Sequence, residues 1–258
     1  MKAFPLYEGS YTVDASKKFV PFDPLTQDPL TRKGSVFVHI YPFLIETADE
    51  LILLDTGLGQ LNEDGELKLH VNIRKAGYDP SQVSKVIMSH LHSDHSLGLV
   101  IPDGNSFRPS FPDADIYIQK NELATALEDR PSSYPRRQVQ FIIDHARIHL
   151  LDEDGSISPS IQYELSGGHS PYHQVIYVDS GSDYYFYGGD EMPESAAVIR
   201  NYIAKYDYDG RKSRDLRTGY FKRASEEGWK CLFYHDFTSR PIAGIGQNND
   251  ASYKLIIP

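Results

Sequence analysis

Apolar and β-branched residues dominate the first third of the chain. The runs SVFVHIYPFLIET (35–47) and ELILLDTG (50–57) are separated by a short polar turn, so they predict a β-hairpin or two adjacent strands. The run LKLHVNIRKAG (67–77) spaces its apolar residues as a helix does and ends at a glycine. A short buried strand, SKVIMSH (84–90), then leads directly into a histidine-rich turn.

After the histidine-rich turn, apolar runs alternate with short segments that are rich in Pro, Gly and Asp. Residues 98–115 predict a long surface loop, 114–119 a strand, and 121–129 a helix with Asn121 as its N-cap. Further helices are predicted over 138–146 and 211–228. Short strands are predicted over the remaining apolar runs, which are 147–157, 160–167, 174–190, 230–236 and 252–258. This alternation predicts an α/β protein with mixed sheets.

Composition narrows the class of protein. A chain of 258 residues that is 40% hydrophobic and 24% charged is expected to form one domain over 1–258. The N-terminal stretch lacks the apolar core of a signal peptide, and the longest apolar run (36–45) is too short for a membrane span. We therefore expect a cytoplasmic protein with no membrane partner. The diffuse net charge of −10 makes nucleic acid a poor partner, because nucleic-acid binding depends on phosphate neutralisation.

The stretch MSHLHSDHSLG (88–98) carries the most specific chemistry. His90 and His92 lie two residues apart after a strand, so their side chains can converge on one metal ion. Asp94 and His95 lie beyond the bend and can face a second ion position. A polar surface turn that is histidine-rich by chance is the alternative, but the pattern H-x-H-x-D-H directly after a buried strand favours a metal site. Cysteine plays no part in it, because Cys231 is the only cysteine.

Four motifs along the chain resemble those of the metallo-β-lactamase-fold hydrolases. Besides the histidine cluster, these are LLDTG (53–57), GGHSPYHQ (167–174), GGD (188–190) and FYHD (233–236). Their order and spacing both fit that superfamily. The resemblance implies a four-layer αβ/βα sandwich, in which two mixed β-sheets are flanked by helices.

The resemblance also implies the role of each site residue. One metal would be held by three histidines, which are His90, His92 and His169. The other would be held by Asp94, His95 and His235, and Asp190 would bridge the two. Asp55 and His173 would orient ligands by hydrogen bonds. The alternatives for these two are a turn cap before Gly57 and an ordinary buried histidine. The remaining histidines match no motif and are expected to be structural; they are His39, His70, His145 and His149.

Two divalent ions that share a carboxylate imply hydrolysis. Each ion lowers the pKa of bound water from about 15.7 toward roughly 7, which makes hydroxide available to attack a polarised carbonyl or phosphoryl centre. Asp94, besides its ligand role, would relay a proton to the leaving group. Zinc is the expected metal, and manganese, iron or cobalt suit the same ligands.

The motifs SHLHSDH, GHSPYHQ and FYHD are most similar to the N-acyl homoserine lactone lactonase group, which implies a small lactone, ester or related acyl substrate. That group places a tyrosine three residues after the bridging aspartate, whereas this chain has Pro193. The tyrosines that could supply a hydroxyl instead are Tyr172, Tyr202 and Tyr206.

Two other functions stay open. A phosphodiester or organophosphate hydrolase on the same site would require cations over the metals, and the nearest candidates in sequence are Arg200, Lys205 and Arg211. A metal-binding protein without turnover, in which the ions only stabilise the fold, is the third hypothesis.

Overall fold

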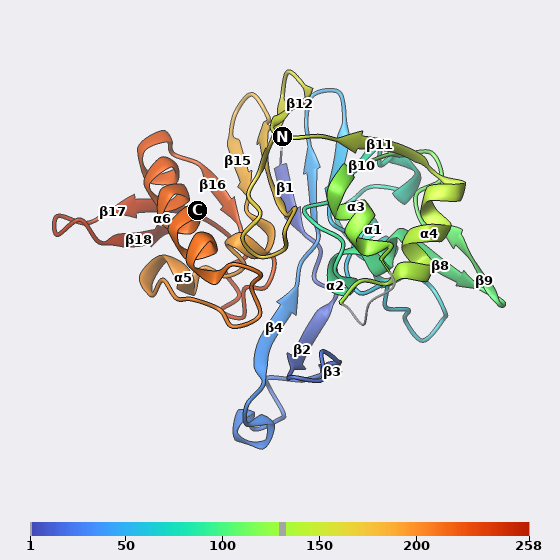
Figure 1. Ribbon diagram of the computed structural model, residues 1–258, viewed down its shortest axis with the longest axis horizontal. Helices are drawn as coiled ribbons and strands as arrows, with labels where there is room; N and C mark the ends of the chain where they lie inside the picture. Colours follow the sequence, from blue (N-terminus) through green and yellow to red (C-terminus); the bar gives the residue numbers. More distant parts are fainter. Residues whose placement is uncertain (1, 129–132, 258) are drawn as a thin grey trace.

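A six-stranded mixed sheet forms one half of the structure (Figure 1). The computed structural model describes residues 2–128 and 133–257. The strand order is β1(Lys2–Pro5)-β5(Phe43–Glu46)-β6(Leu51–Leu54)-β7(Lys85–Ile87)-β10(Asp115–Gln119)-β11(Arg147–Leu151). The antiparallel β5–β6 pair confirms the predicted hairpin. The strands from β6 to β11 pair in parallel, so the sheet is mixed.

A seven-stranded sheet forms the other half. Its order is β12(Gly155–Ser158)-β13(Ile161–Leu165)-β14(Gln174–Asp179)-β15(Tyr184–Tyr187)-β16(Lys230–Leu232)-β17(Ile242–Gln247)-β18(Tyr253–Ile256). Neighbouring strands are antiparallel except β15 and β16, which pair in parallel across a connection that contains a long helix. Short strands are thus observed within each of the apolar runs for which they were predicted.

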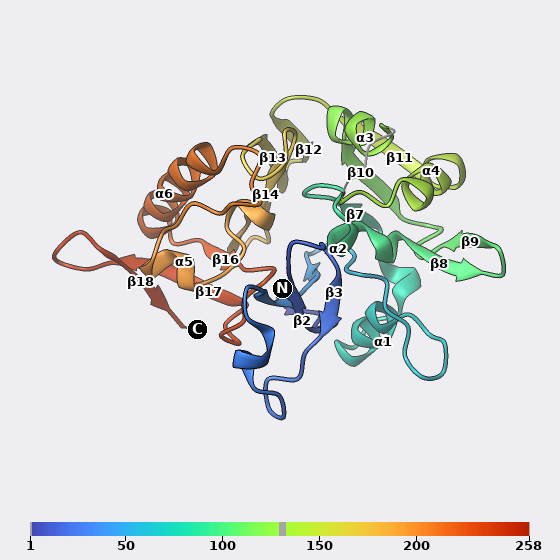
Figure 2. The same cartoon turned by 60° about the horizontal axis from the view of Figure 1, so that its bottom comes forward.

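Helices cover the outer face of each sheet (Figures 1 and 2). Three lie over the first sheet, which are α1(Lys68–Lys75), α3(Lys120–Ala126) and α4(Arg136–His145). Two lie over the second, which are α5(Ala196–Ile199) and α6(Gly210–Glu227). The predicted helices over 67–77, 138–146 and 211–228 are therefore confirmed. The predicted helix over 121–129 is present but ends at Ala126, and its last predicted residue lies outside the described residues.

Three hydrophobic clusters separate these layers. Within β5, Phe43 and Ile45 enter the cluster between the sheets, while Leu44 enters the cluster under α1, α3 and α4. Likewise, Ile176 of β14 faces the first sheet and Tyr177 faces α6. Because both faces of these strands are buried, their sequences are continuous apolar runs and do not alternate with polar residues. The predicted four-layer sandwich of two mixed sheets and flanking helices is confirmed.

Two sequence predictions about local structure are wrong. Residues 98–115 are not a single loop, because a 3-10 turn (η3, Leu97–Leu99) leads into a hairpin of β8(Val100–Asp103) and β9(Ser106–Pro109). Its two-residue turn is formed by Gly104 and Asn105, and Gly104 has φ +56°. Asn121 is not an N-cap either. The Gln119 side chain caps α3 by accepting from the backbone N–H groups of residues 121 and 122.

A small third sheet extends from the sandwich, in the order β3(Phe19–Pro21)-β2(Gly9–Val13)-β4(Val36–Ile40). The remaining elements are short: α2(Ser93–Ser96), η1(Pro29–Arg32), η2(Pro80–Gln82) and η4(Gly189–Glu191). No helix within the described residues has the length and apolar character needed to cross a membrane.

Candidate metal centre

The four donors of the first half lie at the end of β7. His90 and His92 precede α2, and Asp94 and His95 lie on it. The loop is held by Asp55 at the end of β6, whose carboxylate accepts from the N–H (2.7 Å) and the Oγ (2.6 Å) of Ser89. The Asp55 backbone adopts the left-handed region, φ +55°, which is uncommon for a residue with a side chain. This turn aims the Asp55 carboxylate at the histidine loop.

His169 comes from the loop between β13 and β14 of the second sheet. The backbone N–H groups of Gly168 and His169 both donate to Oε1 of Glu191, at 2.7 and 2.9 Å. A Cβ at position 168 would lie 2.7 Å from a Glu191 oxygen, so the close approach requires glycine there. A buried carboxylate thus fixes the His169 loop through its backbone.

Asp190 and His235 follow β15 and β16. The N–H of Asp190 donates to Nε2 of His173 at 3.1 Å, and the other ring nitrogen of His173 lies 2.8 Å from Ser166 Oγ. The backbone N–H of His235 donates to the carbonyl oxygen of Pro193 at 2.8 Å, and its Nδ1 lies 3.0 Å from the carbonyl oxygen of His39. These contacts place both side chains at the same end of the sandwich as the histidine loop.

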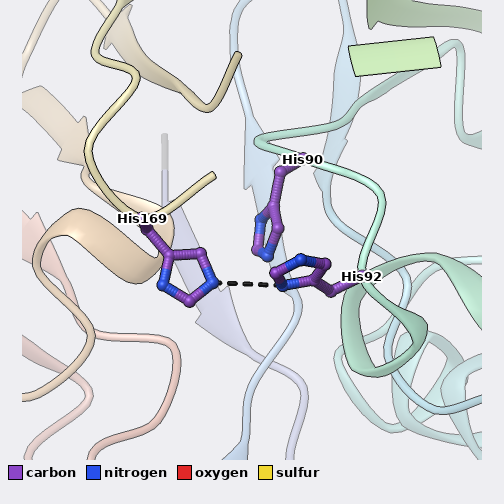
Figure 3. A group of neighbouring side chains, drawn as sticks. All are labelled: His90, His92 and His169. Atoms are coloured by element: carbon purple, nitrogen blue, oxygen red, sulfur yellow. Dashed lines mark hydrogen bonds between the residues drawn. The ribbon is translucent and has the colours of Figure 1, made fainter. Parts of the chain in front are cut away.

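The structure brings the predicted ligands together in two groups. In what we call the first subsite, the ligand atoms of His90, His92 and His169 all lie within 4.8 Å of one another (Figure 3). In the second subsite, the same limit holds for Asp94, His95 and His235.

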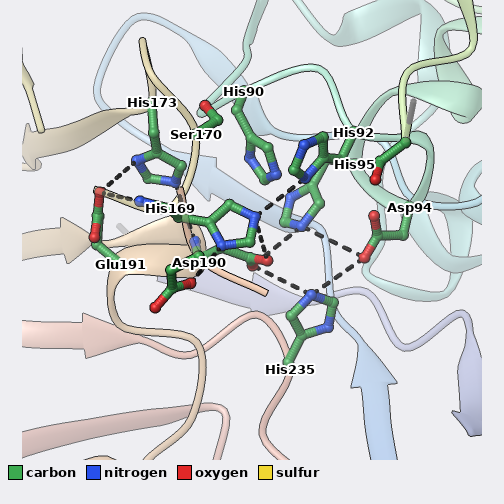
Figure 4. A network of polar contacts seen from close by, with 12 residues as sticks. His90, His92, Asp94, His95, His169, Ser170, His173, Asp190, Glu191 and His235 are labelled. Carbon is green, nitrogen blue, oxygen red and sulfur yellow. Dashed lines mark hydrogen bonds and ion pairs between the residues drawn. The ribbon is translucent and has the colours of Figure 1, made fainter. Parts of the chain in front are cut away.

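Asp190 lies between the two subsites (Figure 4). Its Oδ2 is 3.2 Å from Nε2 of His169, and its Oδ1 is 3.2 Å from Nε2 of both His95 and His235. One carboxylate oxygen therefore faces each subsite.

A third group, Asp55, His90 and His95, meets the same distance limit but is a poor metal site. Besides both contacts with Ser89, the Asp55 carboxylate accepts from Tyr187 OH at 2.5 Å and lies 2.7 Å from Nδ1 of His95. Its oxygens are thus occupied by donors. Asp55 contacts a candidate ligand ring and leaves Nε2 of His95 directed at Asp190, which is the arrangement of an orienting residue.

Orphaned polar atoms support a cation at this centre. Among the described residues, Nε2 of His90 is buried without a hydrogen-bond partner. Nε2 of His95 and Oδ1 of Asp190 are buried with only charge contacts, to each other, to Asp94 and to His235, none of them an aligned hydrogen bond. Buried polar atoms are nearly always satisfied, so atoms of this kind beside one another require an explanation. Imidazole nitrogens and carboxylate oxygens are the ligands of zinc and its transition-metal neighbours. The residues present fit such an ion.

The electrostatics of the centre favour positive charge. Burial opposes protonation of His95, but Asp190, Asp94 and Asp55 outweigh it and raise its pKa to about 10. Burial would also raise the pKa of Asp190, yet His235, His169 and His95 hold it well below the usual range. By contrast, burial and the neighbouring His169 lower the pKa of His92 to about 3. The carboxylates therefore stabilise a cation, whether a proton or a metal ion, while His92 stays neutral.

Three buried carboxylates near the site were not predicted. Glu191 holds the His169 loop, as described above. Glu122 of α3 accepts from Leu91 N–H (3.1 Å) and Ser170 Oγ (2.9 Å), so it joins the histidine loops of both halves. Asp207 lies 2.9 Å from Nδ1 of His169. None belongs to a recognisable motif, and their positions depend on how the loops pack; only the place of Glu191 directly after Asp190 was a signal.

Tyr206 and the candidate basic residues can be compared with two expectations from the sequence, which are a substitute tyrosine hydroxyl and cations for a phosphate substrate. The ring of Tyr206 lies 5.9 Å from that of His169 and its residue is half exposed. Burial of its hydroxyl, followed by the charges of Asp190 and Asp207, raises the pKa of Tyr206, so it stays protonated. Within the part of the chain that the structure describes, the ion pairs of Asp94 and Asp190 are with histidines alone, and none involves Arg200, Lys205 or Arg211.

The sequence itself relates this site to known proteins. Residues 36–194 match the family model of the Metallo-beta-lactamase superfamily, which is more than half of the chain. The chain belongs to this superfamily. That segment contains β4 through η4 and every candidate ligand except His235.

Individual relatives are more distant. An N-acyl homoserine lactonase of Bacillus thuringiensis is 28% identical over 160 residues, which cover 55% of this chain and 58% of that relative. The match therefore spans little more than half the length of the curated relative. The structure is also similar to that of a probable metal-dependent hydrolase from Staphylococcus aureus, with a TM-score of 0.78 at 21% identity over 100% of this chain and 96% of that one.

A second similar structure is that of AidC, a dizinc quorum-quenching lactonase, in complex with a product. Its TM-score is 0.74 at 20% identity, and the match covers 99% of this chain and 94% of that one. At these identities the structural likeness establishes the metallo-beta-lactamase fold.

Proposed function

We propose that the protein is a metal-dependent hydrolase that cleaves a small lactone, ester or related acyl substrate at a dinuclear, zinc-binding centre. The position of Asp190 carries this proposal, because its two oxygens each lie 3.2 Å from ring nitrogens of different subsites. His90, His92 and His169 would hold one ion, and Asp94, His95 and His235 the other. The curated N-acyl homoserine lactonase relatives support an acyl substrate.

Bound divalent ions supply Lewis-acid polarisation of the substrate oxygen and lower the pKa of water. The chain's own residues orient the candidate ligands. Asp55 sets the ring of His95, and His173 holds the backbone of Asp190. Asp94 is a buried member of the second subsite, where its carboxylate would pass a proton to the leaving group.

The surroundings favour acyl over phosphoryl transfer. The segment beside His169 exposes apolar and aromatic residues, with Ile203 49%, Tyr206 52% and Tyr208 71% exposed. Phosphate recognition would call for cationic donors paired over the centre. Pro193 stands where the lactonase group has a tyrosine, and the hydroxyl of Tyr206 is the candidate to replace it.

The test combines metal analysis with turnover by the full chain. We expect two ions per chain in the wild-type protein, and hydrolysis of a γ-lactone or p-nitrophenyl ester but not of bis-p-nitrophenyl phosphate. Asp190→Ala should remove both metal and turnover, whereas Asp179→Asn, at an exposed strand end, should keep both. A wild-type protein that binds no ion when excess metal is present would refute the dinuclear centre. Bound metal together with turnover of the phosphodiester would show that the site catalyses phosphoryl transfer and not acyl transfer.

A further inference from the structure

The connection between α5 and α6, residues 200–209, lies directly against the His169 loop. The backbone N–H of Tyr208 donates to the carbonyl oxygen of His169 at 2.9 Å, and that of Asp209 donates to Gly168 at 2.8 Å. Glu191 accepts the N–H groups of the same two residues from the other side. The loop that carries His169 is therefore held between η4 and this connection.

Asp207 extends this contact to the ligand ring itself. Its side chain is 1% exposed, and its Oδ1 lies 2.9 Å from Nδ1 of His169. The other ring nitrogen, Nε2, is 3.1 Å from Nδ1 of His92 and 3.2 Å from Oδ2 of Asp190. A carboxylate that accepts the N–H of one imidazole nitrogen leaves the lone pair on the other, and also increases its basicity as a ligand.

We propose that Asp207 is the positioning residue of the first subsite. It fixes the His169 ring so that Nε2 faces His92 and Asp190. This inference rests on the proposed metal centre and assigns a role to a residue outside every motif of the sequence. Asp55 makes the equivalent contact with His95 in the second subsite, at 2.7 Å. Each subsite thus has one histidine oriented by a buried carboxylate.

The backbone around Asp207 is anchored independently of its carboxylate. Arg217 of α6 is 1% exposed and its Nη1 donates to Oδ1 of Asn201 and to the carbonyl oxygen of Tyr202, both at 3.1 Å. Its Nε donates to the carbonyl oxygen of Glu191 at 2.6 Å. Removing the Asp207 carboxylate should therefore leave the connection in place and change mainly the His169 ring.

Three variants of the full chain test the role by metal binding rather than turnover. They are Asp207→Ala, Asp207→Asn, and Asp215→Asn as the control, whose side chain is 67% exposed. Zn²⁺ affinity is measured by chelator competition, and the absorption spectrum of the Co²⁺-loaded protein reports each subsite's geometry. Melting of the metal-free proteins checks folding.

For Asp207→Ala we expect one ion to bind about 10- to 100-fold more weakly while the other binds as in wild type, with an altered Co²⁺ spectrum. Asp207→Asn should be intermediate, because the amide oxygen still accepts the N–H but carries no charge. Asp215→Asn should match wild type.

An Asp207→Asn protein that binds both ions as tightly as wild type, with an unchanged Co²⁺ spectrum, would overturn the inference, even if Asp207→Ala failed to fold. Since asparagine fills the same volume, a space-filling role predicts that result. Failure of the proposed metal centre is distinguishable, because the wild-type protein itself would then bind no ions, and a different substrate class would change turnover but not these binding results.

Discussion

The two halves of the chain supply the candidate centre in different ways. The first half contributes four donors within six consecutive positions, residues 90–95, at the end of one strand. The second half contributes His169, Asp190 and His235 from three separate loops of the other sheet. Each subsite nevertheless combines both halves. Local sequence can concentrate donors, but only the packing of the two sheets completes either subsite.

The supporting contacts differ in the same way. The first-half loop is held by Asp55, which is also reached by Tyr187 OH from the second sheet at 2.5 Å. The second-half loops are held by carboxylates from their own half, Glu191 and Asp207, and by His173. Glu122 links the two sets of loops. Variants in each half can therefore test whether the halves act on the same ions.

Among the variants that compare the two halves, the largest effect is expected when one histidine is removed from each half of the first subsite. His90→Gln and His169→Gln should each reduce the metal content from two ions to one and lower turnover by about 10²- to 10³-fold, as for loss of a preorganised electrostatic group. Metal analysis and steady-state kinetics measure both. His145→Gln, at the end of α4 and stacked on Phe141, is the control. Unequal metal loss between the two variants would show that the halves do not share an ion.

The next largest effect is expected for Asp55→Asn, because this substitution changes a side chain that contacts both halves. An amide cannot accept from all the donors that reach Asp55, so at least one buried donor loses its partner, and we expect a loss of about 3 kcal/mol in the free energy of unfolding. Chemical denaturation measures it, with Asp49→Asn as the exposed control. A change below about 0.5 kcal/mol, the range of ordinary surface substitutions, would contradict the contact network.

The pH dependence of the metal-free protein's stability tests the contact between the two halves in the second subsite. The pKa of His95 is raised from 6.5 to about 10, chiefly by Asp190 from the other half against the opposing effect of burial. Its protonation therefore contributes stability that is fully present below pH 6.5 and lost as the pH rises through 10. We expect the melting temperature of chelator-treated protein to fall over that range.

Metal should oppose this trend, because it competes with protons for the same nitrogens. Scanning fluorimetry with Zn²⁺ or with chelator distinguishes the two forms. His95→Gln should make the profile of the metal-free protein less steep, and the remaining slope comes from His169 and His235, whose pKa values are also raised. A wild-type profile that is already flat without metal would argue against the charge contacts between His95 and Asp190.

The smallest effect is expected for a substitution of the half-exposed Tyr206, beside the centre. Tyr206→Phe removes one hydroxyl beside His169, and a neutral hydrogen bond of about 1 kcal/mol corresponds to roughly a 5-fold loss in kcat/KM. Metal content should not change, because the candidate ligands of both subsites are histidines and carboxylates, all of which this variant keeps. Kinetics on the lactone and the ester measure it, with Tyr208→Phe as the control from the same connection. Full activity in Tyr206→Phe would exclude the hydroxyl as a replacement for the tyrosine absent at Pro193.

Much of the fold was predictable from the sequence. Strands such as β6 and β14 are buried on both faces, so they stand out as continuous apolar runs, and glycines with positive φ follow α1 and α6, which are Gly77 and Gly228. The errors came where one signal had two meanings. The Asp-Gly-Asn stretch at 103–105 indicated a loop but contains the last residue of β8 and the two-residue turn of the β8–β9 hairpin. Polar Asn121 suggested a cap, although the side chain of Gln119 reaches the free N–H groups.

For the site, the sequence by itself identified the candidate ligands, because the cluster at 90–95 has a metal-binding spacing and the motifs around His169, Asp190 and His235 resemble those of the superfamily. Which donors face one another was decided by the tertiary structure, since Asp190 touches both subsites only when the sheets pack face to face. The same holds for Glu122, Glu191 and Asp207. A single carboxylate has no sequence signature of its own, and it supports the candidate ligands only when folding buries it beside a backbone N–H or a histidine ring.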